Sequence, residues 1–135
     1  MKEAKCHSNS HSKYLIKLHF VLAIKYRKKL LKGELNDDLI QIIYEICNEK
    51  GYLVDALQSD IDHLHILVDV EPKVSALEIA HQIKQISMFR IYKKHKEFLK
   101  KHFWKKNILW SEGYFVCSTG DASTKTIQKY IEEQG

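Results

Sequence analysis

A ten-residue stretch, IDHLHILVDV at residues 61–70, constrains the fold of this chain more than any other part of it. Side chains on a β-strand alternate between its two faces, so Leu64, Ile66 and the two valines point one way and form an aliphatic surface. His63 and His65 point the other way and lie about 6.6 Å apart along the strand. The stretch therefore predicts a strand with one face in the core and an imidazole pair on the other.

The spacing of the two imidazoles lets both rings reach one metal ion from the same side of the strand. A histidine on a strand can equally be a hydrogen-bonded structural residue, so the pair alone leaves both interpretations open. Because the pair lies opposite the apolar face, core packing explains it poorly, and this position favours a metal site. His19 falls on the mixed face of an earlier strand, where it could neighbour the pair, although a bystander role is the simpler interpretation.

Length and composition are typical of one soluble globular domain. The chain has 135 residues, of which 44% are hydrophobic and 29% charged. We expect a poorly ordered lead-in over residues 1–13 and a single domain over 14–135. No stretch approaches the roughly 18 apolar residues of a membrane span, and there is no signal-peptide pattern, so no membrane partner is expected. The widely spaced Cys6, Cys47 and Cys117 are interpreted as reduced thiols of a cytoplasmic protein.

Positive charge is concentrated in two segments of the chain, whose net charge is +5. Residues 84–106 contain nine Lys and Arg residues and a single acid, Glu97, and a second cluster lies within residues 25–32. Aromatic residues are interleaved with both clusters. Cations suit phosphates and flat rings suit unpaired bases, so this combination favours single-stranded nucleic acid as the partner. A solvated basic helix with its aromatic rings in the core is the alternative for any one residue.

Three further strands are expected besides the histidine strand. Apolar and polar residues alternate over residues 14–25, which predicts a long first strand. Residues 52–58 predict a strand that pairs antiparallel with the histidine strand through a short turn. Residues 108–119 predict a last strand with a kink at Gly113.

Three helices complete the expected fold. Asn36 is a suitable N-cap for a helix that stops at Gly51, and Ser75 opens a second helix with a capping box. A short helix is expected over residues 124–134. The order β-α-β-β-α-β-α is the split βαβ arrangement of ferredoxin-like and RNA-recognition-like folds. The predicted class is therefore α/β (α+β), with a four-stranded antiparallel sheet and helices on one face.

The last helix contains a second candidate pair, Tyr130 and Gln134, four residues apart and hence on one helical face. Alone, Tyr130 is typical of an amphipathic helix. Beside the His pair it is a candidate nucleophile, since a phenol with a pKa near 10 is only about one-thousandth ionised at pH 7 and gains from a cation that polarises a phosphate. Gln134 offers a neutral oxygen ligand, which favours a hard ion such as Mg²⁺ or Mn²⁺.

Four motifs together resemble one protein family: HLH at 63–65, KYR at 25–27, WSEGYF at 110–115 and YIEEQ at 130–134. They are similar to motifs of the single-tyrosine HUH transposases of the smallest insertion sequences, of the REP-associated tyrosine transposase type. The resemblance implies an enzyme that cuts single-stranded DNA beside a hairpin at each transposon end, forms a 5′-phosphotyrosine, releases a 3′-hydroxyl and rejoins strands without ATP.

The resemblance also implies roles for individual residues. It gives the metal-ligand role to His63, His65 and Gln134, and the nucleophile role to Tyr130. The expected DNA-binding residues are Lys25, Arg27, Lys84, Ser87 and Arg90. The chain departs from the family pattern at Ile61, where a proline is common, and at residues 84–86, which lack the usual glycine-containing turn.

The resemblance implies a homodimer as well, because excision needs two phosphotyrosines and each chain offers one candidate nucleophile. The long first strand is a plausible sheet edge for pairing, and Tyr130 is expected to act on the partner's His pair rather than its own. A different class of function stays open beside this one: a non-catalytic single-stranded nucleic-acid-binding module of RNA-recognition type. Covalent capture of DNA separates the two.

Overall fold

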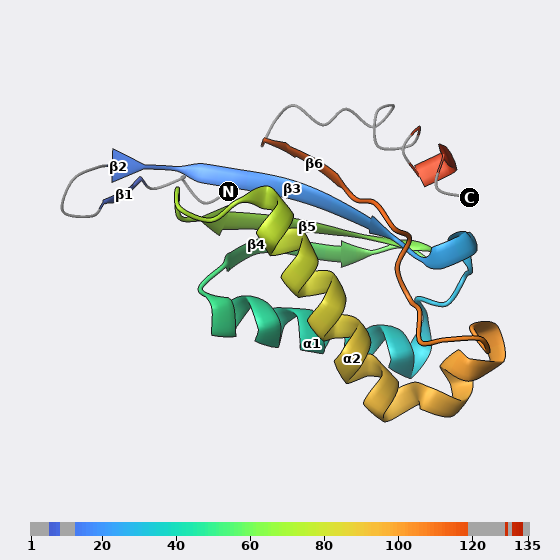
Figure 1. Ribbon diagram of the computed structural model, residues 1–135. Helices are drawn as coiled ribbons and strands as arrows, with labels where there is room; N and C mark the ends of the chain where they lie inside the picture. The colour runs from blue at the N-terminus through green and yellow to red at the C-terminus, as the bar shows by residue number, and fades with distance from the viewer. Residues whose placement is uncertain (1–5, 9–12, 119–128, 130, 134–135) are drawn as a thin grey trace.

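The computed structural model describes residues 6–8, 13–118, 129 and 131–133. Its elements in chain order are β1 (His7–Ser8), β2 (Lys13–Tyr14), β3 (Ile16–Ala23), the short 3₁₀ turn η1 (Lys25–Arg27), α1 (Gly33–Lys50), β4 (Leu53–Ser59), β5 (His63–Val70), α2 (Ala76–His102) and β6 (Phe115–Ser118). Strands β4, β5, β3 and β6 form one antiparallel sheet in that order, and α1 and α2 cover one of its faces (Figure 1). The predicted α+β class with a four-stranded antiparallel sheet is confirmed.

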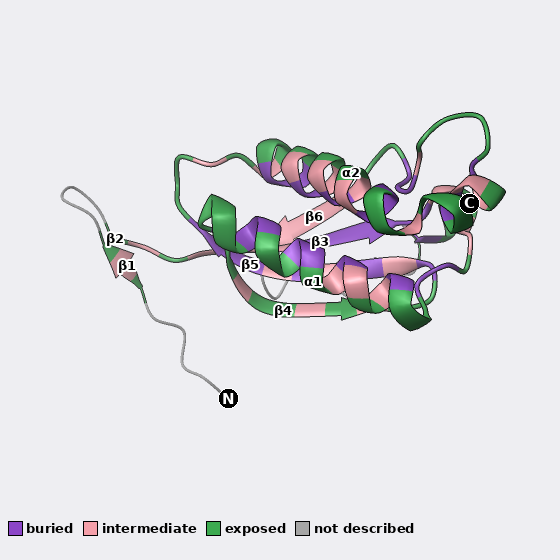
Figure 2. Cartoon of the chain, turned by 90° about the horizontal axis from the view of Figure 1, so that it is seen from below, coloured by how far each residue is buried: buried purple, intermediate pink, exposed green. Residues whose placement is uncertain are grey.

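The histidine strand is β5, which lies inside the sheet between β3 and β4. Its side chains Leu64, Ile66 and Val68 are fully buried and pack with Phe20 and Leu22 of β3 in the core between the sheet and the helices (Figure 2). Burial of the aliphatic face is therefore confirmed, and the two histidines lie on the face away from α1 and α2.

The two long helices are present, with one boundary corrected. Ser75 caps α2 as predicted, since its Oγ accepts a hydrogen bond from the Glu78 backbone N–H at 3.1 Å. Helix α1 starts at Gly33 rather than after Asn36, and no side chain caps it. The additional turn buries Leu35, and that burial outweighs the capping preference of Asn36.

The first strand is shorter than predicted, and it is not a sheet edge. Strand β3 ends at Ala23, because η1 turns the chain at residues 25–27. It pairs with β5 on one side and with β6 on the other, so its backbone is already hydrogen-bonded on both sides. The edges of this sheet are β4 and β6.

The predicted strand over residues 108–119 is also corrected. Within it, the structure contains the strand Phe115–Ser118 and an isolated bridge between Trp110 and Ile24. The carbonyl oxygens of residues 111–113 accept hydrogen bonds from the Lys84 ammonium group instead of joining the sheet. The Lys84 side chain thus satisfies these three carbonyl groups in place of a neighbouring strand, while the Ser111 backbone N–H still donates to the Ala23 carbonyl oxygen.

The predicted lead-in contributes a small second sheet. Strand β1 pairs antiparallel with β2, and the His7 imidazole Nε2 lies 2.8 Å from a carboxylate oxygen of Asp69 on β5. No helix within the described part of the chain is long and apolar enough to cross a bilayer. None of the three cysteines, Cys6, Cys47 and Cys117, forms a disulfide.

Candidate active site

The two histidines of β5 lie side by side on the face of the sheet away from the long helices. Their ring centroids are 4.9 Å apart, and the rings meet edge to face at 73°. In the β3–β5 register His63 lies opposite Ala23 and His65 lies opposite Val21. Ala23 and Val21 are both buried. The alternation of the strand thus brings together the two predicted ligands.

A carboxylate and a guanidinium group stand behind His63. The His63 Nδ1 lies 2.8 Å from Asp62 Oδ1, and Arg27 Nε lies 3.5 Å from the other oxygen of the same carboxylate. Asp62 has only 9% of its surface exposed, and a buried carboxylate is costly without a partner of opposite charge. Arg27 supplies that charge. The sequence did not predict this contact of Asp62, because adjacent residues of a strand nominally face opposite sides.

Arg27 reaches Asp62 because the backbone of η1 is held in an unusual conformation. Tyr26 and Arg27 have φ angles of 60° and 50°, in the left-handed region that non-glycine residues rarely adopt. Each such residue costs about 1–3 kcal/mol, so the conformation persists only where the surrounding structure holds it. The turn directs Arg27 back toward the sheet, so this predicted DNA-binding residue is engaged in an ion pair beside the candidate site.

His19 is a direct neighbour of His65, which corrects the simpler expectation of a bystander. The His19 Nε2 and His65 Nδ1 atoms are 3.1 Å apart, a hydrogen bond in which one nitrogen carries the hydrogen. Burial, with smaller contributions from His63 and His19, lowers the pKa of His65 to about 4. His65 is therefore neutral at pH 7, the state in which an imidazole binds a metal ion.

The surroundings of the pair fit a metal-binding role. The Nδ1 atom of each ring has a hydrogen-bond partner, Asp62 for His63 and His19 for His65, so Nε2 is the nitrogen of each ring that would be available to a metal ion. Within the described ranges, no group of three or more His, Cys, Asp or Glu side chains is placed to hold a metal ion. Strand β5 thus offers two candidate ligands, and a metal ion would need further oxygen ligands from elsewhere, as the prediction for Gln134 requires.

The predicted nucleophile Tyr130 and the predicted ligand Gln134 lie outside the described residues. Residues 129 and 131–133 are helical, in agreement with the predicted last helix, and Ile131 is buried. Figure 1 shows this segment on the side of the sheet away from α1 and α2. That is the side of the sheet that carries the His pair.

The three predicted DNA-binding residues of α2 make contacts within the protein. Lys84 donates to the carbonyl oxygens of Ser111, Glu112 and Gly113 at 2.8 to 3.0 Å, and burial lowers its pKa. Ser87 is fully buried and accepts a hydrogen bond from the Trp110 indole at 3.0 Å. These contacts hold the WSEGYF segment against α2.

Arg90, the third of these residues, forms a 2.8 Å ion pair with Glu49 of α1. Lys25, the first residue of η1, has its ammonium group 5.3 Å from the centre of the Tyr26 ring. The predicted DNA contacts of Lys25, Arg27, Lys84, Ser87 and Arg90 stay predictions, and the full burial of Ser87 argues against a direct one.

Comparison with protein families gives a match over nearly the whole chain. Residues 12–134 match the family model for IS200-like transposases. The ISDra2 transposase TnpA of Deinococcus radiodurans is 30% identical over 121 residues, which cover 90% of this chain and 85% of that protein. The transposase for insertion sequence element IS200 of Salmonella typhimurium is 28% identical over 127 residues, which cover 94% of this chain and 82% of that protein.

Solved structures of two transposases share the fold. A crystal structure of a candidate transposase from Deinococcus radiodurans superposes with a TM-score of 0.88 at 27% identity, covering 95% of this chain and 97% of the other. The structure of a REP-associated tyrosine transposase bound to a REP hairpin has a TM-score of 0.52 at 13% identity, covering 93% and 69% of the two chains. The second likeness concerns the fold alone.

Proposed function

The chain belongs to the IS200-like transposase family, and we propose that it cuts and rejoins single-stranded DNA at hairpin-bearing insertion-sequence ends through a 5′-phosphotyrosine at Tyr130. Membership of the family makes it a DNA transposase, an enzyme that cleaves and transfers DNA strands. The strand specificity, the covalent intermediate and the metal requirement are the parts that we propose.

The observation that carries the proposal is the pair of imidazoles on β5. His63 and His65 lie with ring centroids 4.9 Å apart, and the Nδ1 atom of each ring is already hydrogen-bonded. A histidine with a purely structural role does not require a second imidazole beside it or a buried carboxylate bonded to its ring. Neighbours that fix the orientation of each ring are typical of metal-binding histidines, and they support the proposed ligand role.

In the proposed reaction, the Tyr130 phenol oxygen attacks the scissile phosphorus and forms a P–O bond. The bond from phosphorus to the 3′-oxygen breaks, and that oxygen takes up one proton to become a 3′-hydroxyl, which balances the proton that the phenol gives up. The reverse attack by a 3′-hydroxyl of another strand restores a phosphodiester and releases the phenol. The energy of the broken bond is kept in the phosphotyrosine, so no ATP is required.

His63 and His65 would hold a divalent ion, Mg²⁺ or Mn²⁺, with Gln134 as an oxygen ligand. When bound, this ion supplies electrostatic stabilisation of the phosphate as charge develops on it. Asp62 keeps the Nδ1 hydrogen of His63 in place, and Arg27 balances the carboxylate charge. His19 performs the corresponding orienting role for His65.

The proposed DNA partner is a strand that carries a hairpin, a view supported by the hairpin in the structure of the REP-associated relative. Two cuts and one strand exchange need two tyrosines at once, so we propose that the working unit is a homodimer. Its site of action is the cytoplasm, where its DNA substrate and reduced cysteines are both expected.

Covalent capture of DNA tests the proposal. The protein is incubated with Mg²⁺ or Mn²⁺ and a labelled single strand from the end of the element, and adducts are resolved by denaturing electrophoresis. We expect an adduct that disappears in Tyr130→Phe, while strand binding persists, and that is lost in His63→Ala and in EDTA. An adduct of normal yield in Tyr130→Phe contradicts the proposed nucleophile.

The alternative function, a non-catalytic binding module, predicts a different result in the same assay. Such a module would bind the strand in EDTA and in Mg²⁺ equally and would form no adduct with any cation. Binding without an adduct, over a set of strands from both element ends, would favour it.

A further inference from the structure

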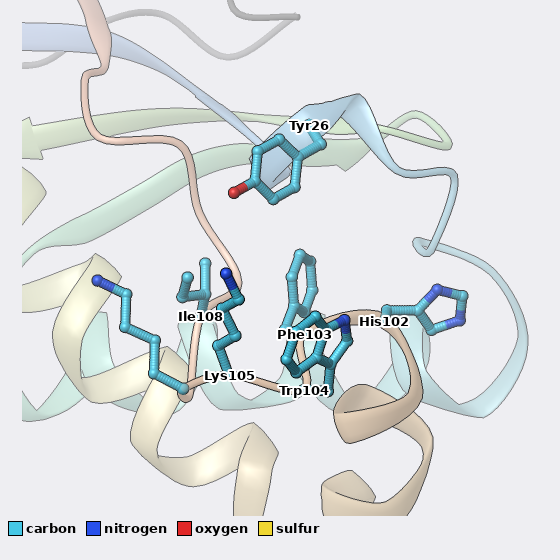
Figure 3. A pocket seen from close by; sticks show the side chains of 7 residues that line it. Tyr26, His102, Phe103, Trp104, Lys105 and Ile108 are labelled. Atoms are coloured by element: carbon cyan, nitrogen blue, oxygen red, sulfur yellow. The ribbon is translucent and has the colours of Figure 1, made fainter.

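A pocket of about 310 Å³ lies between η1 and the segment that follows α2 (Figure 3). Figure 3 shows Tyr26 on one side of the pocket and Phe103 and Trp104 on the other. Lys105 and Lys106 also line it, and none of the described lining residues is acidic. The volume is at the lower end of the range for small-ligand pockets, so a single planar group is the size of ligand it suits.

Two of the rings in this pocket are exposed rather than packed. Tyr26 has 60% of its surface exposed and Trp104 has 71%, whereas Phe103 is buried at 4% and anchors its segment in the core. Single exposed aromatic residues are common and need no explanation. Here, however, two exposed rings from different elements line one pocket. Together they present a flat apolar surface to water, which is unfavourable unless a ligand covers it.

The charge around the pocket is positive. The Lys25 ammonium group lies 5.3 Å from the Tyr26 ring centre, and the Lys105 ammonium group lies 5.2 Å from the Trp104 ring centre. Burial, followed by the charges of Lys28, Lys101 and Lys32, lowers the pKa of His102 beside the pocket. A ligand with a flat apolar face and a flanking negative charge matches this surface.

The pocket is also linked to the candidate active site. Tyr26 is held in the left-handed region next to Arg27, whose guanidinium group contacts Asp62, the partner of His63. Figure 1 shows η1, the end of α2 and the helical residues 131–133 at the same end of the molecule. A strand that passes the His pair can therefore reach this pocket.

We propose that the pocket binds one unpaired base of the DNA strand, stacked between Tyr26 and Trp104, with the adjacent phosphates on Lys105 and Lys106. This inference rests on the proposed function, because it deepens it by naming a subsite for the same strand. Base stacking on an aromatic ring tolerates any base, so the pocket contributes affinity and strand position more than sequence selection.

The test uses two probes of equal charge: a labelled twelve-nucleotide oligothymidylate and a matched twelve-unit abasic strand. Binding is measured in EDTA so that cleavage does not contribute. Trp104→Ala should weaken binding of oligothymidylate by about 5- to 150-fold, the usual effect of one lost stacking partner, and leave binding of the abasic strand unchanged. Trp104→Phe, which keeps a flat ring, should retain most of the affinity.

Tyr26 requires a substitution that tolerates its backbone conformation, and asparagine adopts the left-handed region more readily than most residues. Tyr26→Asn should therefore reproduce the selective loss seen with Trp104→Ala. The matched control is Phe89→Ala on α2, another exposed ring with a lysine, Lys93, 4.4 Å from its centre but outside this pocket. It should change binding of neither probe.

Equal losses for both probes in Trp104→Ala and Tyr26→Asn would overturn the inference, since the rings would then support the basic segment rather than a base. A loss in Phe89→Ala as large as that in Trp104→Ala would overturn it as well. Adduct formation by the wild-type protein is scored separately. If the wild-type protein forms adducts but binds the two probes equally, the subsite is refuted and the proposed function stands. If it forms no adduct and binds no strand, both are refuted.

Discussion

At the scale of single residues, Asp62 decides how His63 is presented. Its carboxylate accepts the Nδ1 hydrogen of His63 at 2.8 Å and is itself nearly buried beside Arg27. The His pair could be predicted from sequence because a strand places every second side chain on one face. The contact between Asp62 and His63 could not be predicted in this way, because adjacent residues of a strand nominally face opposite sides. The carboxylate reaches the ring only because the chain turns at the start of β5.

We expect Asp62→Asn to weaken binding of Mn²⁺ by about 10- to 100-fold, the usual cost of losing a partner that orients a histidine ligand. The amide keeps the size of the side chain but not its charge, so folding is preserved better than in an alanine variant. Titration calorimetry measures the affinity, and Asp37→Asn, an exposed carboxylate on α1, is the control. Equal affinities in wild type and Asp62→Asn would show that Asp62 does not position the ligand.

At the scale of elements, Lys84 explains why the last strand is shorter than its sequence predicts. Alternation and apolar content indicated a continuous strand over 108–119, yet three consecutive carbonyl oxygens in this stretch are bound by one ammonium group from α2. Such a contact joins segments 27 to 29 residues apart and leaves no local pattern. Capping at Ser75, by contrast, is local and was predicted correctly.

Replacing Lys84 by methionine should therefore lower the free energy of unfolding by about 1–3 kcal/mol, because hydrogen bonds from a charged group to three carbonyls are lost. Urea unfolding followed by circular dichroism measures the change. Lys94→Met, at an exposed position of the same helix, should have little effect. Unchanged stability in Lys84→Met, together with weaker DNA binding, would return Lys84 to the DNA-contacting role that the family resemblance implied.

At the scale of the whole molecule, the sheet order restricts how two chains can assemble. The first strand was expected to offer an edge for pairing, but β3 is enclosed by β5 and β6, and β4 and β6 are the edges. The existence of a strand depends on local alternation, so the strand itself could be predicted. The order of strands in a sheet depends on contacts between distant segments, so the internal position of β3 could not. The predicted dimer stays a prediction, with a different edge available to it.

The last helix decides whether each dimer site is built from one chain or two. Residues 131–133 lie on the side of the sheet that carries the His pair, so Tyr130 could serve the site of its own chain or that of its partner. Tyr130→Phe lacks the nucleophile and His63→Ala lacks a ligand, so each protein alone should be inactive. If Tyr130 acts on the partner's His pair, a mixed dimer contains one site with an intact His pair and an intact tyrosine.

We therefore expect strand cleavage to return when the two variants are mixed and their subunits exchange, because one of the two sites in each mixed dimer is complete. Subunit exchange is followed independently by energy transfer between labelled chains. A mixture of Tyr130→Phe with itself, labelled in the same way, controls for any effect of mixing. Confirmed exchange without recovery of cleavage would show that each chain uses its own tyrosine, because both sites of a mixed dimer then lack one essential group.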